Sequence, residues 1–284
     1  MTIRSTRAPR PQNVLDVLRT EQIAPHLVRV IAGGPGFADF APNEFSDPYV
    51  KIYFARESLG LEPPYDLLEL RGKLDPDDLP VTRTYTVRSV DLEAGELSID
   101  FVVHGDEGLA GPWAAKAQPG DKLVFAGPGG GFKPDPEADW YLFAGDESAL
   151  PAIASSLEAL PADAVGTAFL EVYSSADEIA LAAPAGVEVV WLHRGTARAG
   201  TSTVLVDRVS LLPWREGRVQ VFAHGERESM KAMRDELFTT RGLERWQVSL
   251  SGYWAYGRSE DRFQAEKREP IGQILLEPAP GATA

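Results

Sequence analysis

Cysteine is absent from the 284-residue sequence, and this absence excludes several kinds of chemistry. Without thiolates the chain forms no disulfide, holds no iron–sulfur cluster and builds no thiolate zinc site. Histidine is scarce too, and the four that occur lie too far apart along the chain to form a local metal motif. They are His26, His104, His193 and His224. We therefore predict no metal site, and any redox chemistry must use a bound cofactor.

Basic side chains are outnumbered, with 28 Lys and Arg against 42 Asp and Glu and a formal net charge of -14. Nucleic-acid binding and stable membrane association are disfavoured, because both need a clustered basic surface. Long hydrophobic runs are also missing, since no stretch of about 18 apolar residues occurs. Arg4, Arg7 and Arg10 lead into no apolar segment of the kind that directs export. We expect a cytoplasmic protein.

The first half of the chain alternates short apolar segments with Gly, Pro and Asp, which is typical of antiparallel strands. The predicted strands are 13–19, 26–32, 49–54, 82–90, 97–103 and 122–126. Their spacing favours a small barrel or sandwich. The segment 113–116 predicts a short helix between strands, and 56–80 predicts a long, partly irregular surface insertion.

The second half has a different rhythm, in which apolar runs alternate with segments that can be helical. The predicted strands are 140–144, 166–173, 187–192, 218–223 and 246–252, and the predicted helices are 149–160, 226–241 and a short one at 259–269. This alternation is typical of β/α units on a parallel sheet. The sequence Lys-Pro-Asp-Pro at 133–136 continues neither a strand nor a helix, so we place the boundary there.

The predicted fold is therefore an α+β protein of two domains, residues 1–135 and 136–284. The N-terminal domain is an antiparallel β-barrel, and the C-terminal domain is a Rossmann-like α/β domain with a parallel sheet. The length agrees with a division into two domains of ordinary size. The Pro, Ala and Gly-rich tail 278–284 is predicted to be disordered.

The most informative motif is Arg-Thr-Tyr-Thr-Val-Arg at 83–88, inside a predicted strand. Strand alternation places Arg83 and Tyr85 on one face and Thr84 and Thr86 on the other. A guanidinium fits a diphosphate, an aromatic ring can stack on a flavin, and a hydroxyl or amide can hydrogen-bond the edge of the flavin ring. The same run also fits a surface strand with charged ends, so both interpretations stay open.

Two loops of the second half follow predicted strands, which is where nucleotides bind in α/β sheets. The first, 145–153, opens a predicted helix, and the second begins at Gly225-Glu226. Asp146-Glu147-Ser148 fits a nucleotide contact or a plain helix cap. His224, beside the second loop, could contact a phosphate or be structural.

Several nucleotide and catalytic motifs are missing. No Gly-x-Gly-x-x-Gly fingerprint lies between a strand and a helix, and the glycines at 129–131 indicate an interdomain turn. A Gly-x-x-x-x-Gly-Lys phosphate loop and a Gly-x-Ser-x-Gly nucleophile elbow are absent as well. An enzyme that binds two dinucleotides in the usual Rossmann manner is therefore disfavoured.

The Arg-x-Tyr-Thr run in a barrel half, followed by a sheet-and-helix half, resembles the ferredoxin-reductase-type flavoproteins. More specifically, the chain is similar to the siderophore-interacting proteins, also called ferric-siderophore reductases, over nearly its whole length. The matching segments are Tyr49-Val50-Lys51, Arg83 to Arg88, Val103-His104-Gly105, Gly111 to Ala114, Pro119-Gly120-Asp121, Gly145 to Ile153, Gly225-Glu226 and Gly252-Tyr253-Trp254.

This resemblance implies FAD in the first domain and NADPH or NADH in the second. The residues that it implies for FAD are Arg83, Thr84, Tyr85, Thr86, Asp100, Val103, His104, Ala110, Gly111, Pro112 and Trp113. Those implied for the nicotinamide cofactor are Gly145, Asp146, Glu147, Ser148, Ala149, Gly225 and Glu226. Many relatives carry Ala-Ser-Arg before the Trp, where this chain has Leu109 to Pro112. We therefore expect backbone amides, rather than a side chain, to face the diphosphate.

The resemblance further implies that electrons pass from NAD(P)H through flavin to siderophore-bound Fe(III), releasing Fe(II). This chemistry requires no side-chain acid or base, so no catalytic residue is predicted. Many ferric siderophores are anionic, and the matching basic residues are Lys51, Lys133 and Arg258. Many relatives place Arg directly after Gly-Tyr-Trp, where this chain has Ala255-Tyr256-Gly257-Arg258, so the substrate preference stays open.

Two other functions also stay open at this point. One is a general flavin or ferredoxin reductase of the same superfamily. The other is a siderophore-binding accessory protein that transfers no electrons.

Overall fold

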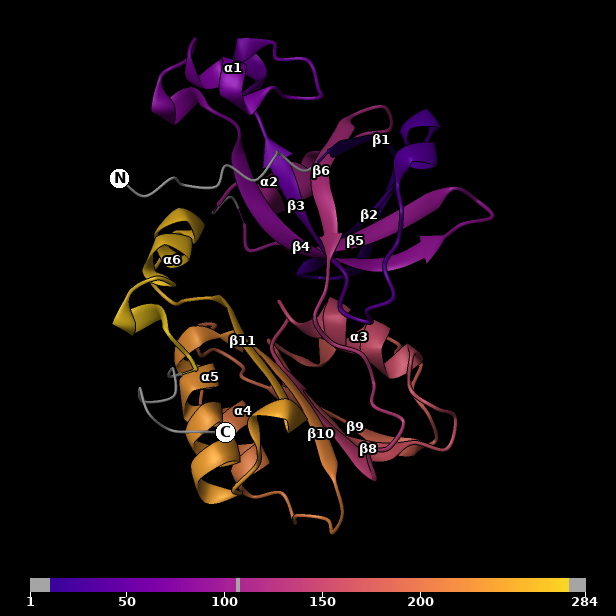
Figure 1. Ribbon diagram of the computed structural model, residues 1–284, viewed down its shortest axis with the longest axis vertical. Coiled ribbons are helices and arrows are strands. Elements are labelled where there is room, and N and C mark those ends of the chain that lie inside the picture. Colours follow the sequence, from indigo (N-terminus) through magenta and orange to yellow (C-terminus); the bar gives the residue numbers. More distant parts are fainter. Residues whose placement is uncertain (1–10, 106–107, 276–284) are drawn as a thin grey trace, which may run out of the picture. The chain divides into compact units, whose positions relative to one another are not determined.

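The computed structural model describes residues 11–105 and 108–275 (Figure 1). Arg4, Arg7, Arg10 and the predicted disordered tail 278–284 lie outside these residues. The chain divides into two compact units. Of the described residues, the first unit contains 11–22, 28–44, 48–105 and 108–130, and the second contains 23–27, 45–47 and 131–275.

The first unit is built on a closed antiparallel barrel in which the strand order is β1-β2-β5-β4-β3-β6. Its strands are β1 (Gln12–Ala24), β2 (Leu27–Gly33), β3 (Tyr49–Phe54), β4 (Val81–Asp91), β5 (Glu96–Val102) and β6 (Lys122–Gly129). Each predicted strand of the first half is confirmed. Closure between β1 and β6 pairs the two edges that an open sheet would leave exposed.

Alternating side chains fill the barrel interior. Along β1, Leu15 and Val17 are buried while their neighbours are more exposed. They join Ile52, Phe101 and Phe125 in one apolar core, as the period of two predicts for a strand with one buried face. The short helix α2 (Ala110–Lys116) adds Ala110 and Ala114 to this core.

The insertion between β3 and β4 lies on the surface, as predicted. It contains the short helix α1 (Leu67–Arg71) and two 3-10 turns, and none of residues 55–80 is buried. Asp66 caps α1 by accepting hydrogen bonds from the Leu68 and Glu69 amides. The local fold here depends on capping and turns rather than on burial.

The second unit contains a parallel five-stranded sheet in the order β11-β10-β7-β8-β9. Its strands are β7 (Trp140–Gly145), β8 (Val165–Val172), β9 (Gly186–His193), β10 (Val219–Glu226) and β11 (Val248–Trp254). Every residue of β7 is buried, because helices cover both faces of its position in the sheet. The fold predicted for the second half is confirmed.

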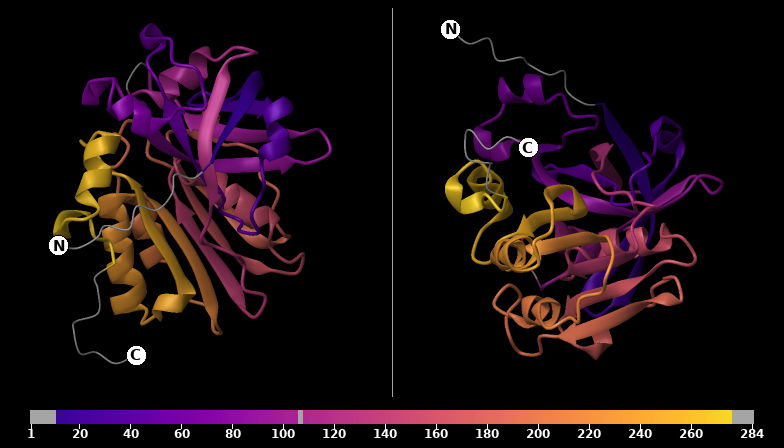
Figure 2. Two further views of the ribbon diagram at one scale, coloured as in Figure 1. Left: turned by 45° about the horizontal axis from the view of Figure 1, so that its top comes forward. Right: turned by 60° about the horizontal axis from the view of Figure 1, so that its bottom comes forward.

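Helices lie on both sides of this sheet (Figures 1 and 2). They are α3 (Leu150–Glu158), α4 (Val204–Ser210) and α5 (Arg227–Arg234), and a further helix, α6 (Glu260–Glu266), follows β11. Leu205 of α4 and Met230 of α5 pack in one core with Leu142 of β7. Helix α4 was missed by sequence reasoning, and the predicted helix 226–241 is α-helical only to Arg234, after which Asp235–Thr240 forms a π-helix.

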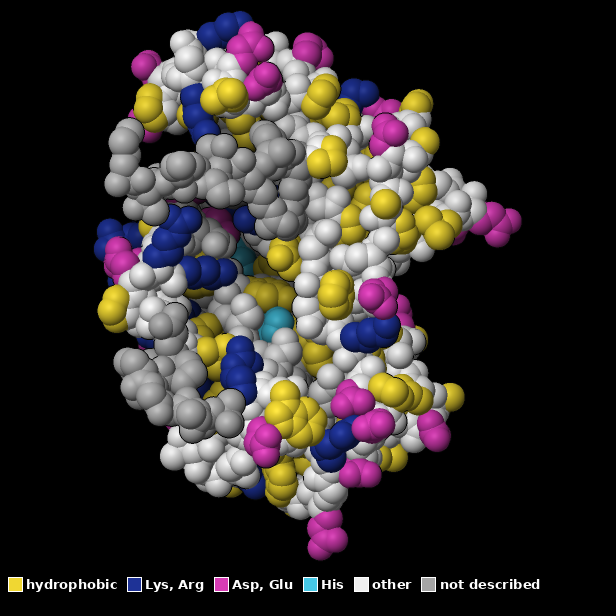
Figure 3. Space-filling model, in the orientation of Figure 1, with side chains coloured by type: hydrophobic (Ala, Val, Ile, Leu, Met, Phe, Trp, Pro, Cys, Tyr) yellow, Lys and Arg dark blue, Asp and Glu magenta, His cyan; other side chains and the backbone are white. Residues whose placement is uncertain are grey.

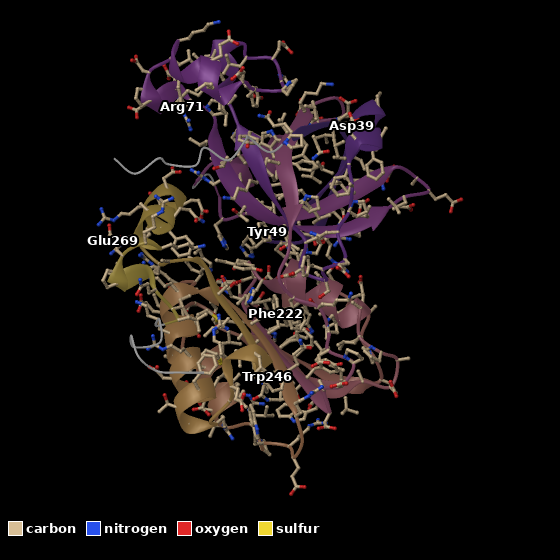
Figure 4. All side chains as sticks on the ribbon, in the orientation of Figure 1. Asp39, Tyr49, Arg71, Phe222, Trp246 and Glu269 are labelled. Atoms are coloured by element: carbon tan, nitrogen blue, oxygen red, sulfur yellow. The ribbon has the colours of Figure 1, made fainter. Side chains whose placement is uncertain are left out.

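The other face of the sheet has an aromatic core of its own. Phe222 of β10 (labelled in Figure 4) packs against Phe132 and Phe143 with ring centroids 5.0 and 6.2 Å apart. Phe132 belongs to the segment that enters the second unit, and the buried Asp47 accepts hydrogen bonds from the amides of Gly131 and Phe132. Thus the segment after the glycine turn is anchored to this unit.

The order in which successive strands are added to the sheet reverses between the parallel strands β7 and β10. The chain runs outward from β7 through β8 to β9, and then crosses to β10 and β11 on the other side. Ligands of open α/β sheets bind beyond the carboxyl ends of the strands at such a reversal. The loops after β7 and β10 are therefore positioned for a ligand.

None of the described helices is sufficiently long and apolar to cross a membrane.

Candidate functional site

The motif at 83–88 lies on β4, as predicted. Arg83 pairs across the sheet with Ile52, and Tyr85 pairs with Val50, so both lie on the side of β4 that faces the barrel core. Thr84 pairs with Lys51 on the opposite side, and both of these side chains are exposed. Arg83 and Tyr85 are half-buried, which keeps part of each accessible.

Tyr85 belongs to a row of aromatic rings. Its ring lies 4.4 Å from that of Phe101 at an interplanar angle of 36°, and Phe101 in turn lies 5.6 Å from Trp113. Phe54 meets the same Trp113 edge-on at 5.5 Å. Phe101 is fully buried, whereas Tyr85 and Trp113 are half-buried. The core therefore holds the row in place, while parts of the Tyr85 and Trp113 rings remain accessible. Such a surface fits a planar aromatic cofactor.

The segment around α2 allows a close approach of backbone. A Cβ on Gly111 would lie 3.0 Å from the carbonyl oxygen of Val102, so a larger residue would push α2 away from β5. Leu109, at the N-cap position, makes no side-chain capping bond, and Pro112 has no amide hydrogen. The predicted contact between backbone amides of this segment and a diphosphate remains a prediction.

Asp100, also predicted to bind FAD, has a protein partner. Arg29 of β2 donates to its two oxygens over 2.6 and 2.8 Å, and Asp100 is almost completely buried. A bidentate guanidinium–carboxylate pair accounts for a buried carboxylate without a ligand. Of the other predicted FAD residues, Thr86 is buried, Val103 is half-buried, and His104 is exposed at the end of the same strand.

Asp146 connects the carboxyl ends of three strands in the second unit. Its Oδ1 accepts hydrogen bonds from the Ser148 amide and hydroxyl, and its Oδ2 accepts from the Glu226 amide and the Trp254 indole. A Cβ on Gly225, which has φ 153°, would lie 2.8 Å from this carboxylate. The predicted residues Asp146, Ser148, Gly225 and Glu226 are thus brought together, and Asp146 ties them to β11.

Glu226 caps helix α5. Its Oε2 accepts from the amides of Glu228 and Ser229, and its Oε1 accepts from the amide of Tyr256. A carboxylate at a helix N-terminus satisfies amides that have no partner within the helix. Glu226 therefore has a structural explanation, and its predicted contact with a nicotinamide cofactor remains a prediction.

A second set of charged side chains lies at the same sheet edge. Glu147, directly after the first residue of the β7 loop, forms an ion pair with Arg194, which follows β9, at 2.5 Å. Glu171, the penultimate residue of β8, is buried beside them and accepts a hydrogen bond from Ser202. Sequence reasoning missed Glu171 and Arg194. The sequence signal that could have identified Glu171 is that it is the one carboxylate in the otherwise mostly apolar strand β8.

Burial governs the acidity of these carboxyls. Burial, together with the repulsion from Asp146 and Glu147, raises the pKa of Glu171 to about 7, although Arg194 opposes the shift. Burial also raises the pKa of Glu147. Removing a carboxylate from water disfavours its charged form, and one positive guanidinium only partly offsets this for two acids.

The stability of the second unit should therefore fall as the pH rises through neutrality. The folded protein holds the Glu171 proton up to a pKa of about 7, whereas the unfolded chain releases it near 4.5. The stabilisation is complete below the unfolded value and is lost as the pH rises through the folded one. We expect Glu171→Gln to remove this component, on the order of 1 kcal/mol after allowance for solvent screening.

Thermal unfolding from about pH 5 to about pH 8 measures the effect, on a scale of about 2–4 °C per kcal/mol. Glu188→Gln, an exposed change on β9, serves as the control and should follow the wild type. Parallel pH profiles for Glu171→Gln and wild type would contradict the assignment.

The three predicted substrate residues lie in different surroundings. Lys51 is exposed on β3 in the first unit. Lys133 lines a groove of about 420 Å³ on the second unit, with Arg245 and the exposed Trp246 at the amino end of β11 (Figure 4). Arg258 donates to Glu266 of α6 at 2.8 Å. Their predicted roles are not decided by these positions.

The carboxylate of Glu266 accepts hydrogen bonds from three arginine side chains. Arg227 reaches one of its oxygens at 2.6 Å, and Arg258 and Arg262 reach the other at 2.8 and 2.9 Å. The hydrogen bond from Arg227, with those of the other two, lowers the pKa of Glu266 to about 2. Figure 3 shows Lys and Arg side chains gathered near α6. One carboxylate thus holds three guanidiniums in place.

His224 is structural, which agrees with the simpler of its two interpretations. Its ring nitrogens lie 2.9 Å from the Tyr253 hydroxyl and 2.9 Å from the Ser249 hydroxyl, and the ring stacks on Phe222 at 3.8 Å. Burial lowers the pKa of His224 to about 3, so the ring stays neutral. Across residues 11–105 and 108–275, no group of three or more His, Cys, Asp or Glu could hold a metal ion.

A closed antiparallel barrel followed by a parallel five-stranded sheet is the architecture of the ferredoxin-reductase-like flavoproteins. The ferredoxin-NADP+ reductase from Plasmodium falciparum has the same fold, with a TM-score of 0.61 over 85% of this chain and 96% of that chain, at 12% identity. At such low identity, the likeness concerns the fold alone.

Sequence comparison narrows the class. Residues 16–132 match the siderophore-interacting FAD-binding domain, and residues 138–257 match the siderophore-interacting protein model. The chain belongs to the siderophore-interacting protein family.

Named relatives agree with this assignment. The ferric vibriobactin reductase ViuB of Vibrio cholerae is 35% identical over 260 residues, 89% of this chain and 93% of that one. The NADPH-dependent ferric-chelate reductase of Escherichia coli is 36% identical over 182 residues, 63% of this chain and 70% of that one. A siderophore utilization protein from T. fusca has a crystal structure with a TM-score of 0.77 and 39% identity, covering 88% of this chain and 95% of that chain.

Proposed function

We propose that this protein is an FAD-dependent ferric-siderophore reductase that takes electrons from NADPH or NADH and releases Fe(II). The observation that carries the proposal is the half-buried Tyr85, which packs against Phe101 beside Arg83 in the unit that matches an FAD-binding domain. The names of the two reductase relatives support the same reaction. Bound FAD would accept a hydride and deliver single electrons.

Residues of the barrel would hold this cofactor. The Arg83 guanidinium can form paired hydrogen bonds to a diphosphate, and the Tyr85 ring can cover one face of a flavin. Phe101 is fully buried behind Tyr85, so it keeps that ring in place. Thr84, Thr86, Asp100, Val103, His104 and the segment 110–113 complete the proposed set.

Residues at the carboxyl edge of the parallel sheet would bind the nicotinamide cofactor. The position of 145–149 and of Gly225-Glu226 at the reversal of strand order supports this role. The assignment of residues 1–135 to FAD and of 136–284 to the nicotinamide cofactor belongs to the same proposal.

The ferric siderophore would be attracted by basic side chains. Lys51 of the first unit and Lys133 and Arg258 of the second are the proposed contacts, and screening over about 8 Å at physiological salt lets nearby basic side chains outweigh the more distant negative charge. No side chain is given a catalytic role, because electron transfer needs no acid or base. We also propose a cytoplasmic location, where NADPH and NADH are available, and no binding to nucleic acid or to an acidic membrane surface.

The expected result is a yellow protein with stoichiometric FAD. Its flavin should bleach under anaerobic conditions with NADPH or NADH and recover its colour when a ferric siderophore is added, with Fe(II) trapped by a chelator. Faster recovery with ferredoxin or free flavin would instead indicate a general reductase. A colourless protein that takes up no FAD but binds ferric siderophores would indicate an accessory binding protein and would refute the proposal.

A further inference from the structure

The carboxyl end of β8 holds chemistry that discriminates between dinucleotides. In doubly wound sheets an acidic residue after the second strand accepts hydrogen bonds from the ribose hydroxyls of NAD, while an arginine near it accommodates the 2′-phosphate of NADP. Here β8 is the second strand of the sheet in chain order, and Glu171 is its penultimate residue. Arg194 follows the adjacent β9, so both types of residue are present.

Arg194 forms an ion pair with the carboxylate of Glu147. Its side chain is only 3% exposed, and its guanidinium lies 2.5 Å from the carboxylate of Glu147, whose side chain is 9% exposed. This contact joins Arg194 Nη1 to Glu147 Oε1, and Arg194 Nε has no hydrogen-bond partner among the described residues. The Nε–H group can therefore donate to an oxygen of a ligand.

The charge around Arg194 decides which acceptor fits. Glu147 and Glu171 oppose one guanidinium, and Asp146 adds a third carboxylate whose oxygens are used by four donors. A 2′-phosphate would bring about -1.5 to -2 more charge to this buried acidic group. Ribose hydroxyls would instead donate to Glu171 and accept from Arg194.

We propose that Glu171 is a specificity-determining residue that makes this chain select NADH over NADPH. The proposal rests on the nicotinamide role assigned above to the same sheet edge. This preference differs from that of the NADPH-dependent ferric-chelate reductase of Escherichia coli.

Binding of two mononucleotides tests this selection without flavin chemistry. Calorimetry on the purified full-length protein should show that 5′-AMP binds at least about tenfold more tightly than 2′,5′-ADP at about pH 8, since tenfold is a difference of about 1.4 kcal/mol. Glu171→Gln should narrow this ratio about threefold or more by removing one negative charge. Glu188→Gln, exposed on β9, should leave the ratio unchanged.

The preference should also depend on pH in the wild type. It should weaken from about pH 8 to about pH 6, because Glu171 becomes protonated while Asp146, Glu147, Arg194 and the Ser202 hydroxyl remain as its charged and polar neighbours. The 2′-phosphate itself titrates near about pH 6, so the comparison with Glu171→Gln isolates the protein's share. In Glu171→Gln, the preference for 5′-AMP should change less with pH than it does in the wild type.

Flavin reduction gives the second readout. Anaerobic reduction of the FAD-loaded wild type should be about tenfold more efficient with NADH than with NADPH, in line with the binding ratio. Tighter binding of 2′,5′-ADP, binding of neither mononucleotide, or an unchanged ratio in a folded Glu171→Gln variant would overturn the selection. A flavin that neither NADH nor NADPH reduces, with 5′-AMP still preferred, would count against the proposed function alone.

Discussion

Alanine at Arg83 or Tyr85 is expected to produce a folded protein that binds FAD more weakly than the wild type. A hydrogen bond to a charged group contributes about 1.5–3 kcal/mol, so Arg83→Ala should weaken FAD binding by about 10- to 100-fold. Tyr85→Ala removes the exposed ring of the aromatic row and should weaken binding by about tenfold. Flavin absorbance after gel filtration, followed by fluorescence titration of the apoprotein with FAD, measures both effects.

Thr82→Ala is the matched control for these variants. Thr82 lies on the same strand, is exposed, and sits on the face opposite to Arg83 and Tyr85. Its removal should leave FAD affinity unchanged, and Tyr85→Phe should keep most of the affinity because the ring remains. Wild-type FAD affinity in both alanine variants would place the cofactor elsewhere on the protein.

Asp146→Ala is expected to destabilise the folded protein. The change leaves the buried Glu226 amide and the Trp254 indole without an acceptor and disconnects the β7 loop from β10 and β11. Removing one partner from a buried charged hydrogen-bond group costs about 3–5 kcal/mol. The expected fall in the unfolding temperature is therefore about 10 °C, at about 2–4 °C per kcal/mol.

Two further variants serve as controls for Asp146→Ala. Asp163→Ala removes an exposed carboxylate from the loop before β8 and should change the unfolding temperature little. Asp146→Asn keeps one acceptor oxygen and should fall between wild type and alanine. Equal unfolding temperatures for Asp146→Ala and wild type would show that water or neighbouring groups replace these bonds.

The periodicity of the sequence was sufficient for the architecture. The pattern of buried and exposed residues in β1 and the wholly apolar run of β7 reflect burial on one face and on two faces. Helix α4 was missed because its seven residues contain one short apolar pattern, Leu205 and Val209, too brief to indicate a helix by itself. The π-helix after Arg234 depends on packing of Leu237 in the core, which local sequence does not display.

Part of the candidate site could be predicted from the sequence, and part could not. The motif at 83–88 was visible because its residue types and strand alternation already express the chemistry of a flavin site. The hydrogen-bond partners of other site residues could not be predicted. Arg29 and Asp100 are separated by 71 residues, and Asp146 and Trp254 by 108. Pairings at such separations depend on how strands associate, which no local pattern encodes.

By itself, the sequence determined the two-domain architecture, the family and the absence of cysteine chemistry, because these depend on residue types and their spacing. Only the tertiary structure decided which charges oppose one another at the sheet edge. Glu147, Glu171 and Arg194 come from the ends of three different strands, and burial changes the acidity of carboxyls that are ordinary in the unfolded chain. Their chemistry exists only where the folded chain brings them together away from water.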